Sequence, residues 1–212
     1  MDIKLVSGLL LIHFMALISP GPDLILTLRN AVNYGMKSGI LSSLGFGTGI
    51  FFHSLLALII IQGFGQFPDD KLPLLGLPGS AFLIYLGIKI WPSKSYEEQE
   101  IDLSQKSSTS PYLQGFFTNL LNPKASIFTI GLITTQVRPD TALITQFTLV
   151  IGIVLLTIFW FSFVSLALSR AKIRDLYFKQ SRVMNYLFSI SFIIFGFMLI
   201  KDALGLLSNN LS

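Results

Sequence analysis

Ser19-Pro20-Gly21-Pro22-Asp23 interrupts an apolar run that extends from Leu5 to Leu28. Two prolines and a glycine break a helix, and Asp23 places an ionisable group inside an apolar segment. In a soluble protein this stretch would be a loop between two short elements. In a membrane protein, a helix break and an acid within a span usually mark a functional site. The composition of the chain therefore decides what the stretch means.

The composition of the 212-residue chain is typical of a membrane protein. Hydrophobic residues make up 52% of the chain and charged residues 12%, and the mean hydropathy is +0.69. A soluble domain carries about 25% charged residues, so this chain has too little polar surface for a globular protein in water. The basic residues are scattered through the connecting loops, which argues against a nucleic-acid partner despite the pI near 9.4. The absence of cysteine excludes disulfides and thiolate metal sites.

Six segments are long and apolar enough to cross a bilayer, which takes about 20 helical residues. They are Leu5–Leu28, Ile40–Ile61, Leu72–Trp91, Tyr112–Thr135, Ala142–Leu168 and Val183–Leu207. The sequence thus predicts an all-α, polytopic membrane protein with one transmembrane domain, residues 1–212. The polar stretch 92–111 predicts a solvated linker between two halves of three spans each, residues 1–91 and 112–212.

The positions of Lys and Arg predict how the chain lies in the membrane. Loops one, three and five hold ten of these residues and the other side holds four, while Lys124 lies within a span. Loops that face the cytoplasm carry an excess of Lys and Arg. We therefore expect loops one, three and five, including the linker, in the cytoplasm and both termini outside it.

The two halves are predicted to form an inverted repeat. Three spans per half is an odd number, so the second half must enter the membrane in the opposite direction. Each half opens with a helix broken at a matching place, Pro20-Gly21-Pro22-Asp23 in the first and Asn122-Pro123-Lys124 in the second. A shift of 101 residues superposes Asp23 on Lys124. Interrupted helices at corresponding positions of two halves indicate the binding site of a transporter.

Asp23 and Lys124 are the charged residues predicted to lie well inside spans. A charge at membrane depth costs at least about 2.5 kcal/mol, so each needs a partner or an aqueous cavity. A carboxylate and an ammonium on two broken helices match a zwitterionic amino acid, with Asp23 facing its ammonium group and Lys124 its carboxylate. The alternative is a permanent Asp23–Lys124 ion pair that merely makes membrane insertion tolerable.

Neighbouring residues complete the predicted binding site. Prolines at the two breaks free backbone carbonyls, and the ends of half-helices offer N–H or C=O groups to a charged ligand. Two asparagines near the second break add neutral hydrogen-bonding groups. The predicted substrate-binding residues are therefore Asp23, Lys124, Asn122, Asn119, Pro20, Gly21, Pro22 and Pro123.

The second span carries a glycine pair and a histidine. Gly45 and Gly49 are four residues apart, on one helix face where another helix can approach closely. His53 follows one turn later on roughly the same face. Because imidazole titrates near neutral pH, we expect Asp23 and His53 to be the groups that couple transport to protons. The alternative for His53 is a neutral histidine bonded to a carbonyl, and this simpler role is the one expected for His13.

Four stretches of the sequence resemble the LysE/RhtB family of amino-acid exporters, which includes homoserine- and threonine-type efflux proteins. They are Ser19–Asp23, Gly45–His53, Gly79–Gly87 and Asn119–Lys124. The resemblance runs the length of the chain. It implies a protein of the bacterial inner membrane that exports amino acids or close derivatives by using the proton motive force, and it suggests a homodimer. One departure is Thr135-Gln136-Val137, where many members carry Pro-Gln-Phe, so no particular substrate follows from the resemblance.

The function predicted from the sequence is export of amino acids or close derivatives from the cytoplasm by a secondary transporter that uses proton antiport. The expected partners are the amino-acid substrate, protons and the lipid bilayer. No phosphate-binding loop, nucleophile elbow or zinc-protease motif occurs, so we expect no enzymatic activity, no metal and no cofactor. Two alternatives stay open: an exporter of a metal ion or other small solute on a similar fold, and a non-transporting membrane interaction protein.

Overall fold

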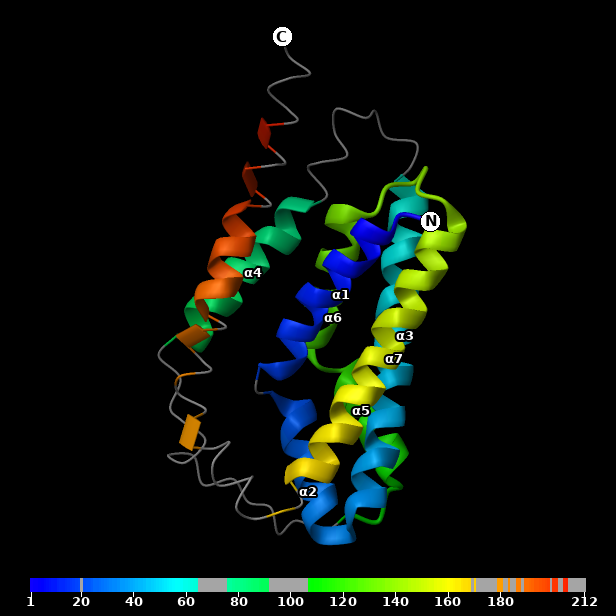
Figure 1. The fold of residues 1–212 in the computed structure, drawn as a ribbon, viewed down its shortest axis with the longest axis vertical. Helices are drawn as coiled ribbons and strands as arrows, with labels where there is room; N and C mark the ends of the chain where they lie inside the picture. The colour runs from blue at the N-terminus through cyan, green and yellow to red at the C-terminus, as the bar shows by residue number, and fades with distance from the viewer. Residues whose placement is uncertain are drawn as a thin grey trace.

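The computed structural model of the protein is helical throughout the part of the chain that it describes (Figure 1). The structure describes residues 1–19, 21–64, 76–91 and 107–168, together with 170, 179–180, 183, 186–187, 189–198, 200–201 and 204–205. The predicted all-α class is confirmed for these residues. Pro20, the first residues of the predicted third span, most of the linker 92–111 and most of the loop 169–182 lie outside them.

The first predicted span is a pair of helices joined at a sharp bend. Helix α1 (Ile3–Ile18) begins at Asp2, whose side chain accepts a backbone hydrogen bond from the first turn. Helix α2 (Pro22–Tyr34) begins at Pro22, which suits the first helical position because its fixed φ is helical and its missing N–H is not needed there. The two helices meet at 60°. Helix α2 ends at Gly35, whose φ of +86° favours glycine.

Two helices are uninterrupted and long. Helix α3 (Met36–Phe64) and helix α7 (Leu143–Leu168) are each long and apolar enough to cross a membrane. The bent pair α1 and α2 is a third candidate when it is counted as one span. The described residues therefore contain two or three candidate spans, whereas the sequence predicts six.

The remaining predicted spans contain shorter helices. Helix α4 (Gly76–Ile90) corresponds to the third predicted span, and the helix Ser189–Met198 lies within the sixth. The fourth is divided into α5 (Pro111–Leu120) and α6 (Pro123–Gln136), with the break at residues 121–122. Both the first and the fourth predicted spans are thus interrupted immediately before a proline.

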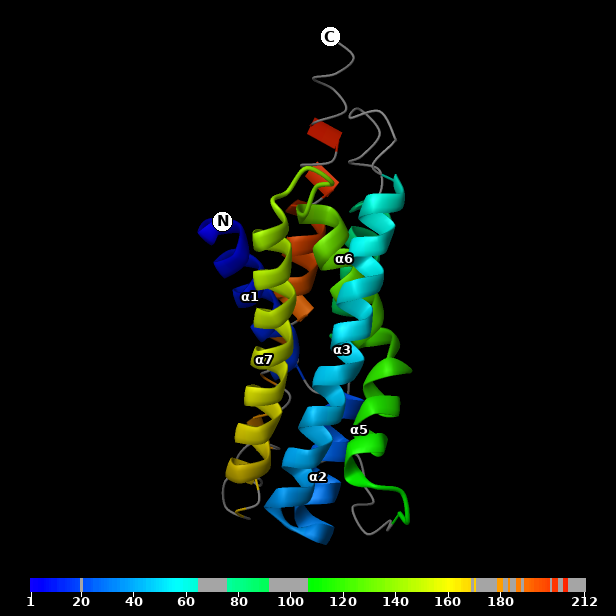
Figure 2. The same cartoon turned by 90° about the vertical axis from the view of Figure 1, so that its right-hand side faces the viewer.

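The broken helices and the long helices lie side by side (Figures 1 and 2). Helix α3 contacts α2, α5, α6 and α7 along its length. Helices α1 and α6 occupy one end of the molecule and α2 and α5 the other, so that both breaks fall near the middle of the long axis. The chain passes through α1 and α2 towards one end and through α5 and α6 towards the opposite end. This arrangement brings the two interruptions together.

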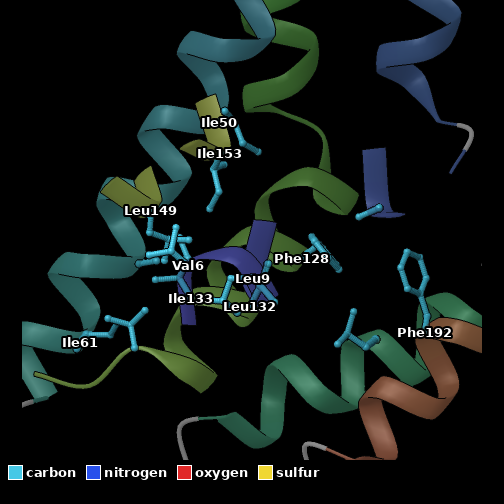
Figure 3. Packing of buried hydrophobic residues seen from close by; sticks show 14 residues of the cluster. Val6, Leu9, Ile50, Ile61, Phe128, Leu132, Ile133, Leu149, Ile153 and Phe192 are labelled. Carbon is cyan, nitrogen blue, oxygen red and sulfur yellow. The ribbon is translucent and has the colours of Figure 1, made fainter. Parts of the chain in front are cut away.

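A cluster of buried apolar side chains fills the end that contains α1 and α6 (Figure 3). Its labelled members are Val6, Leu9, Ile50, Ile61, Phe128, Leu132, Ile133, Leu149, Ile153 and Phe192. They come from α1, α3, α6, α7 and the helix Ser189–Met198. A smaller cluster around Phe46 and Phe161, whose ring centroids are 4.9 Å apart, lies on the other side of the breaks. The breaks are therefore held between two packed apolar regions.

Helices α3 and α5 approach each other so closely that glycine is required at the contact. A Cβ atom added to Gly45 would lie 2.2 Å from the carbonyl oxygen of Tyr112 in α5. A Cβ atom added to Gly115 would lie 2.1 Å from the carbonyl oxygen of Ser42 in α3. Both obstacles are backbone atoms, which cannot turn aside as a side chain can. Small residues that let backbones touch are the usual basis of helix packing in membranes.

We predict that Gly45→Ala destabilises the protein by about 1–3 kcal/mol, the usual cost of forcing extra volume into a packed contact. Thermal unfolding of the purified protein in detergent measures the loss. Gly8→Ala is the matched control, because a Cβ atom at Gly8 in α1 meets no described atom within 4 Å. Equal unfolding temperatures for the two variants would show that the close α3–α5 contact is wrong.

Candidate functional site

Asp23 lies at the centre of the site, in the first turn of α2, and only 6% of it is exposed. Its Oδ2 accepts a hydrogen bond of 2.7 Å from Nδ2 of Asn119, and its Oδ1 accepts one of 3.1 Å from Nδ2 of Asn122. Both donors come from the second broken helix. Hydrogen bonds to an ionised acceptor are about twice as strong as neutral ones. The acid of the first break is therefore held by amides of the second.

Lys124 makes the reciprocal connection from the first turn of α6. Its Nζ donates a hydrogen bond of 2.7 Å to the carbonyl oxygen of Ser19, the residue that ends α1. A cation is favourable there because the carbonyls at a helix C-terminus carry partial negative charge. The side chain also lies against Gly21, where an added Cβ would be 3.4 Å from Nζ. Its charge acts on Asp23 as well.

Trp160 of α7 accounts for another carbonyl at the end of α1. Its Nε1 donates a hydrogen bond of 3.2 Å to the oxygen of Leu17. The last carbonyls of a helix have no partner within the helix and must be satisfied elsewhere. Trp160 is absent from the site predicted from the sequence, because nothing in an apolar run indicates which aromatic residue faces a helix end.

Asn122 has two roles at the second break. Its Oδ1 accepts a hydrogen bond of 3.0 Å from the backbone N–H of Lys124, which caps α6, while its Nδ2 donates to Asp23. Asparagine is among the favoured residues at the start of a helix for this reason. One side chain therefore fixes both the start of α6 and the position of the acid.

A small cavity with a volume of about 40 Å³ lies among these residues. It is lined by fifteen residues, of which the predicted ones are Gly21, Asp23, Asn119, Asn122 and Lys124. Pro22 and Pro123 begin α2 and α6 and are not among the lining residues. Pro20 lies outside the described residues. The geometry thus gathers most of the predicted binding residues around one space.

His53 lies behind Asn119 rather than in the cavity lining. It is 5% exposed, and its Nε2 is 3.2 Å from the carbonyl oxygen of Asn119. Gly49 lies one turn earlier, and a Cβ atom added there would come within 2.7 Å of Oδ1 of Asn119. Gly49 therefore leaves room for the asparagine that holds Asp23. His53 makes the carbonyl contact that was the alternative to a proton-coupling role.

Three further polar residues line the cavity and are not among the predicted substrate-binding residues. They are His13, Ser19 and Thr129, none more than 3% exposed. His13 precedes Ser19 by six residues, and Thr129 follows Pro123 by six. This spacing alone does not identify either residue as part of a site. No group of three or more His, Cys, Asp or Glu side chains lies together in the described residues.

Comparison with known proteins places these residues in a family context. Residues 14–203 match the family model described as LysE type translocator. A homoserine/homoserine lactone efflux protein of Salmonella typhimurium is 27% identical over 64% of this chain and 66% of its own length. The threonine efflux protein of Escherichia coli is 24% identical over 90% of this chain and 94% of its own. The membrane protein YrhP of Bacillus subtilis is 29% identical over 74% and 80%, respectively. No solved structure matches the chain.

We predict that Asp23→Asn lowers the free energy of unfolding by about 1–3 kcal/mol. The NH₂ group of the new asparagine would face the NH₂ group of Asn119 or Asn122, so one of the two hydrogen bonds is lost. The variant Asp23→Asn with Asn119→Asp exchanges the two groups and restores a donor–acceptor pair. Its unfolding temperature in detergent should return towards that of the unaltered protein. A single variant as stable as the unaltered protein would contradict the hydrogen bonding described.

Proposed function

The chain belongs to the LysE type translocator family, and on this premise we propose that it exports amino acids or close derivatives from the cytoplasm as a secondary transporter. A translocator moves a solute across a membrane, so the protein is a transporter and not an enzyme. Two similar proteins are named for the efflux of homoserine or threonine, which are small zwitterions. The proposal extends this substrate class to the present chain.

The observation that carries the proposal is the pair of opposite charges around one buried cavity. Asp23 supplies an acceptor for the ammonium group of an amino acid, and Lys124 supplies a donor for its carboxylate. A ligand that enters replaces the hydrogen bonds that these groups make with Asn119, Asn122 and Ser19. The existing contacts keep both charges satisfied between transport events, which removes most of the cost of placing them in the membrane.

The size of the cavity supports a mechanism of alternating access. A volume of about 40 Å³ is enough for about three water molecules, since one needs at least about 10–15 Å³. An amino acid is larger, so the helices around the breaks must separate before it can bind. The opposite directions of the two broken pairs support the proposed inverted repeat, in which rocking of the halves opens the site first to one side and then to the other.

We further propose that export is coupled to protons at Asp23. Protonation of the carboxylate would remove its attraction for the substrate's ammonium group and favour release outside. His53 is the proposed second proton-coupling group, because it contacts the backbone of the asparagine that donates to Asp23. Moving one elementary charge across 100 mV supplies about 2.3 kcal/mol, which sustains a concentration gradient of tens-fold.

A homodimer is also part of the proposed function and rests on the family resemblance.

The proposal predicts that Asp23→Asn and Lys124→Met each reduce amino-acid efflux at least about tenfold, since each removes one of the charges that bind a zwitterion. Bacteria loaded with dipeptides release the constituent amino acids, and their appearance in the medium measures export. Asp140→Asn is the matched control, because this acid is exposed in the turn between α6 and α7.

Two outcomes of this experiment oppose the proposal. Efflux of every tested amino acid at the unaltered rate, with both variants inserted normally, would exclude binding between these charges. Recovery of efflux in the double variant would indicate instead that the two residues act as a structural pair.

The proposed orientation can be tested because the chain contains no cysteine. Lys37 is exposed in the first turn of α3, on the side that we propose to be cytoplasmic, and Asp140 is exposed in a turn on the opposite side, so cysteine is placed at each. A membrane-impermeant maleimide added to intact spheroplasts should label Asp140→Cys and should label Lys37→Cys only after permeabilisation. The reverse pattern would show that the positive-inside assignment is wrong.

A further inference from the structure

Four residues that line the cavity each carry one buried polar atom without a hydrogen-bond partner among the described residues. These atoms are Nδ1 of His13, Oγ of Ser19, Oδ1 of Asn119 and Oγ1 of Thr129. Leaving such an atom buried and unsatisfied costs about 1–3 kcal/mol. A few are found in most proteins, but here four of the five in the described part of the chain belong to residues that line one cavity. A polar ligand in the cavity would supply the missing partners of the atoms that face it.

The contact between His13 and Thr157 determines what its free nitrogen can bind. Nε2 of His13 is 3.0 Å from Oγ1 of Thr157, which itself donates its hydroxyl hydrogen to the carbonyl oxygen of Ile153 at 2.8 Å. Because the hydroxyl has one hydrogen, it can only accept from His13, so the neutral ring carries its proton on Nε2. Nδ1 is then a hydrogen-bond acceptor and requires a donor on the ligand.

His13 and Thr129 lie at some distance from the charged residues. Each is six residues from the break on its own helix, in α1 and α6 respectively. At 1.5 Å per residue this places both about 9 Å from the breaks along the helix axes. Helices α1 and α6 lie at the same end of the molecule (Figure 1). The cavity lining therefore has a charged region at the breaks and a neutral polar region towards this end.

We infer that His13 and Thr129 form a subsite for the substrate's side chain. The subsite selects side chains that carry a hydrogen-bond donor, such as a hydroxyl or an amide. The inference rests on the proposed function. An amino acid held at the breaks by its ammonium and carboxylate groups extends its side chain towards this subsite. The Phe128 ring, whose centroid is 6.3 Å from that of His13, forms an apolar wall there. An aliphatic side chain of the same shape leaves both polar atoms unsatisfied, which disfavours it.

The test compares Thr129→Val, which replaces the hydroxyl by a methyl group of similar size, with Thr129→Ser, which retains it. Dipeptide-loaded cells release pairs of matched amino acids: threonine and valine, and homoserine and norvaline. The ratio of polar to aliphatic export is the readout, so a change in protein amount cancels. We expect Thr129→Val to lower this ratio about tenfold and Thr129→Ser to keep it close to the original.

His13 is tested through its partner. Thr157→Val removes the group that fixes the imidazole, without altering the cavity lining, and should also lower the ratio. If the Thr129→Val variant exports neither polar nor aliphatic amino acids, the export ratio of the Thr157→Val variant decides whether the subsite exists. Unchanged ratios in both Val variants would overturn the subsite while leaving amino-acid export intact. Failure of the unaltered protein to export any amino acid would instead overturn the proposed function, and the subsite with it.

Discussion

The structure depends on an exchange of partners between two broken helices. The acid at the first break, Asp23, receives hydrogen bonds from Asn119 and Asn122 beside the second break, and Lys124 of the second donates to Ser19 of the first. Each interruption exposes backbone or charge that the apolar surroundings cannot satisfy. Each is satisfied by the other. The two halves of the chain are therefore joined at their least apolar points.

This exchange explains why the surrounding helices pack as they do. Helices α3 and α5 touch at glycines, and Gly49 leaves the space that the Asn119 side chain occupies. Apolar clusters lie on both sides of the breaks. A zwitterionic ligand would replace the hydrogen bonds that Asp23 and Lys124 make in the closed arrangement. Both charges would then keep a partner of opposite charge when the ligand binds.

The sequence was most informative where a residue type is costly in a membrane. Prolines and charges within spans are rare, so the two breaks and the pairing of Asp23 with the region of Lys124 could be predicted, although their role in binding stays a prediction. His13, Thr129 and Trp160 could not be found in this way, because a single neutral residue in an apolar helix faces either lipid or protein according to packing. The described residues contain two or three candidate spans where the sequence predicts six, because a break divides the predicted fourth span and the predicted third and sixth lie partly outside the described residues.

The central claim is that the cavity between the breaks opens and admits an amino acid. Ala125 lines this cavity beside Lys124, and Ala125→Cys would be the sole cysteine of the chain. The rate at which a small maleimide alkylates this cysteine in membranes measures how often the cavity opens. The account predicts measurable alkylation that an exported amino acid slows in a saturable manner. Alkylation at the same rate with and without every exported amino acid would contradict it.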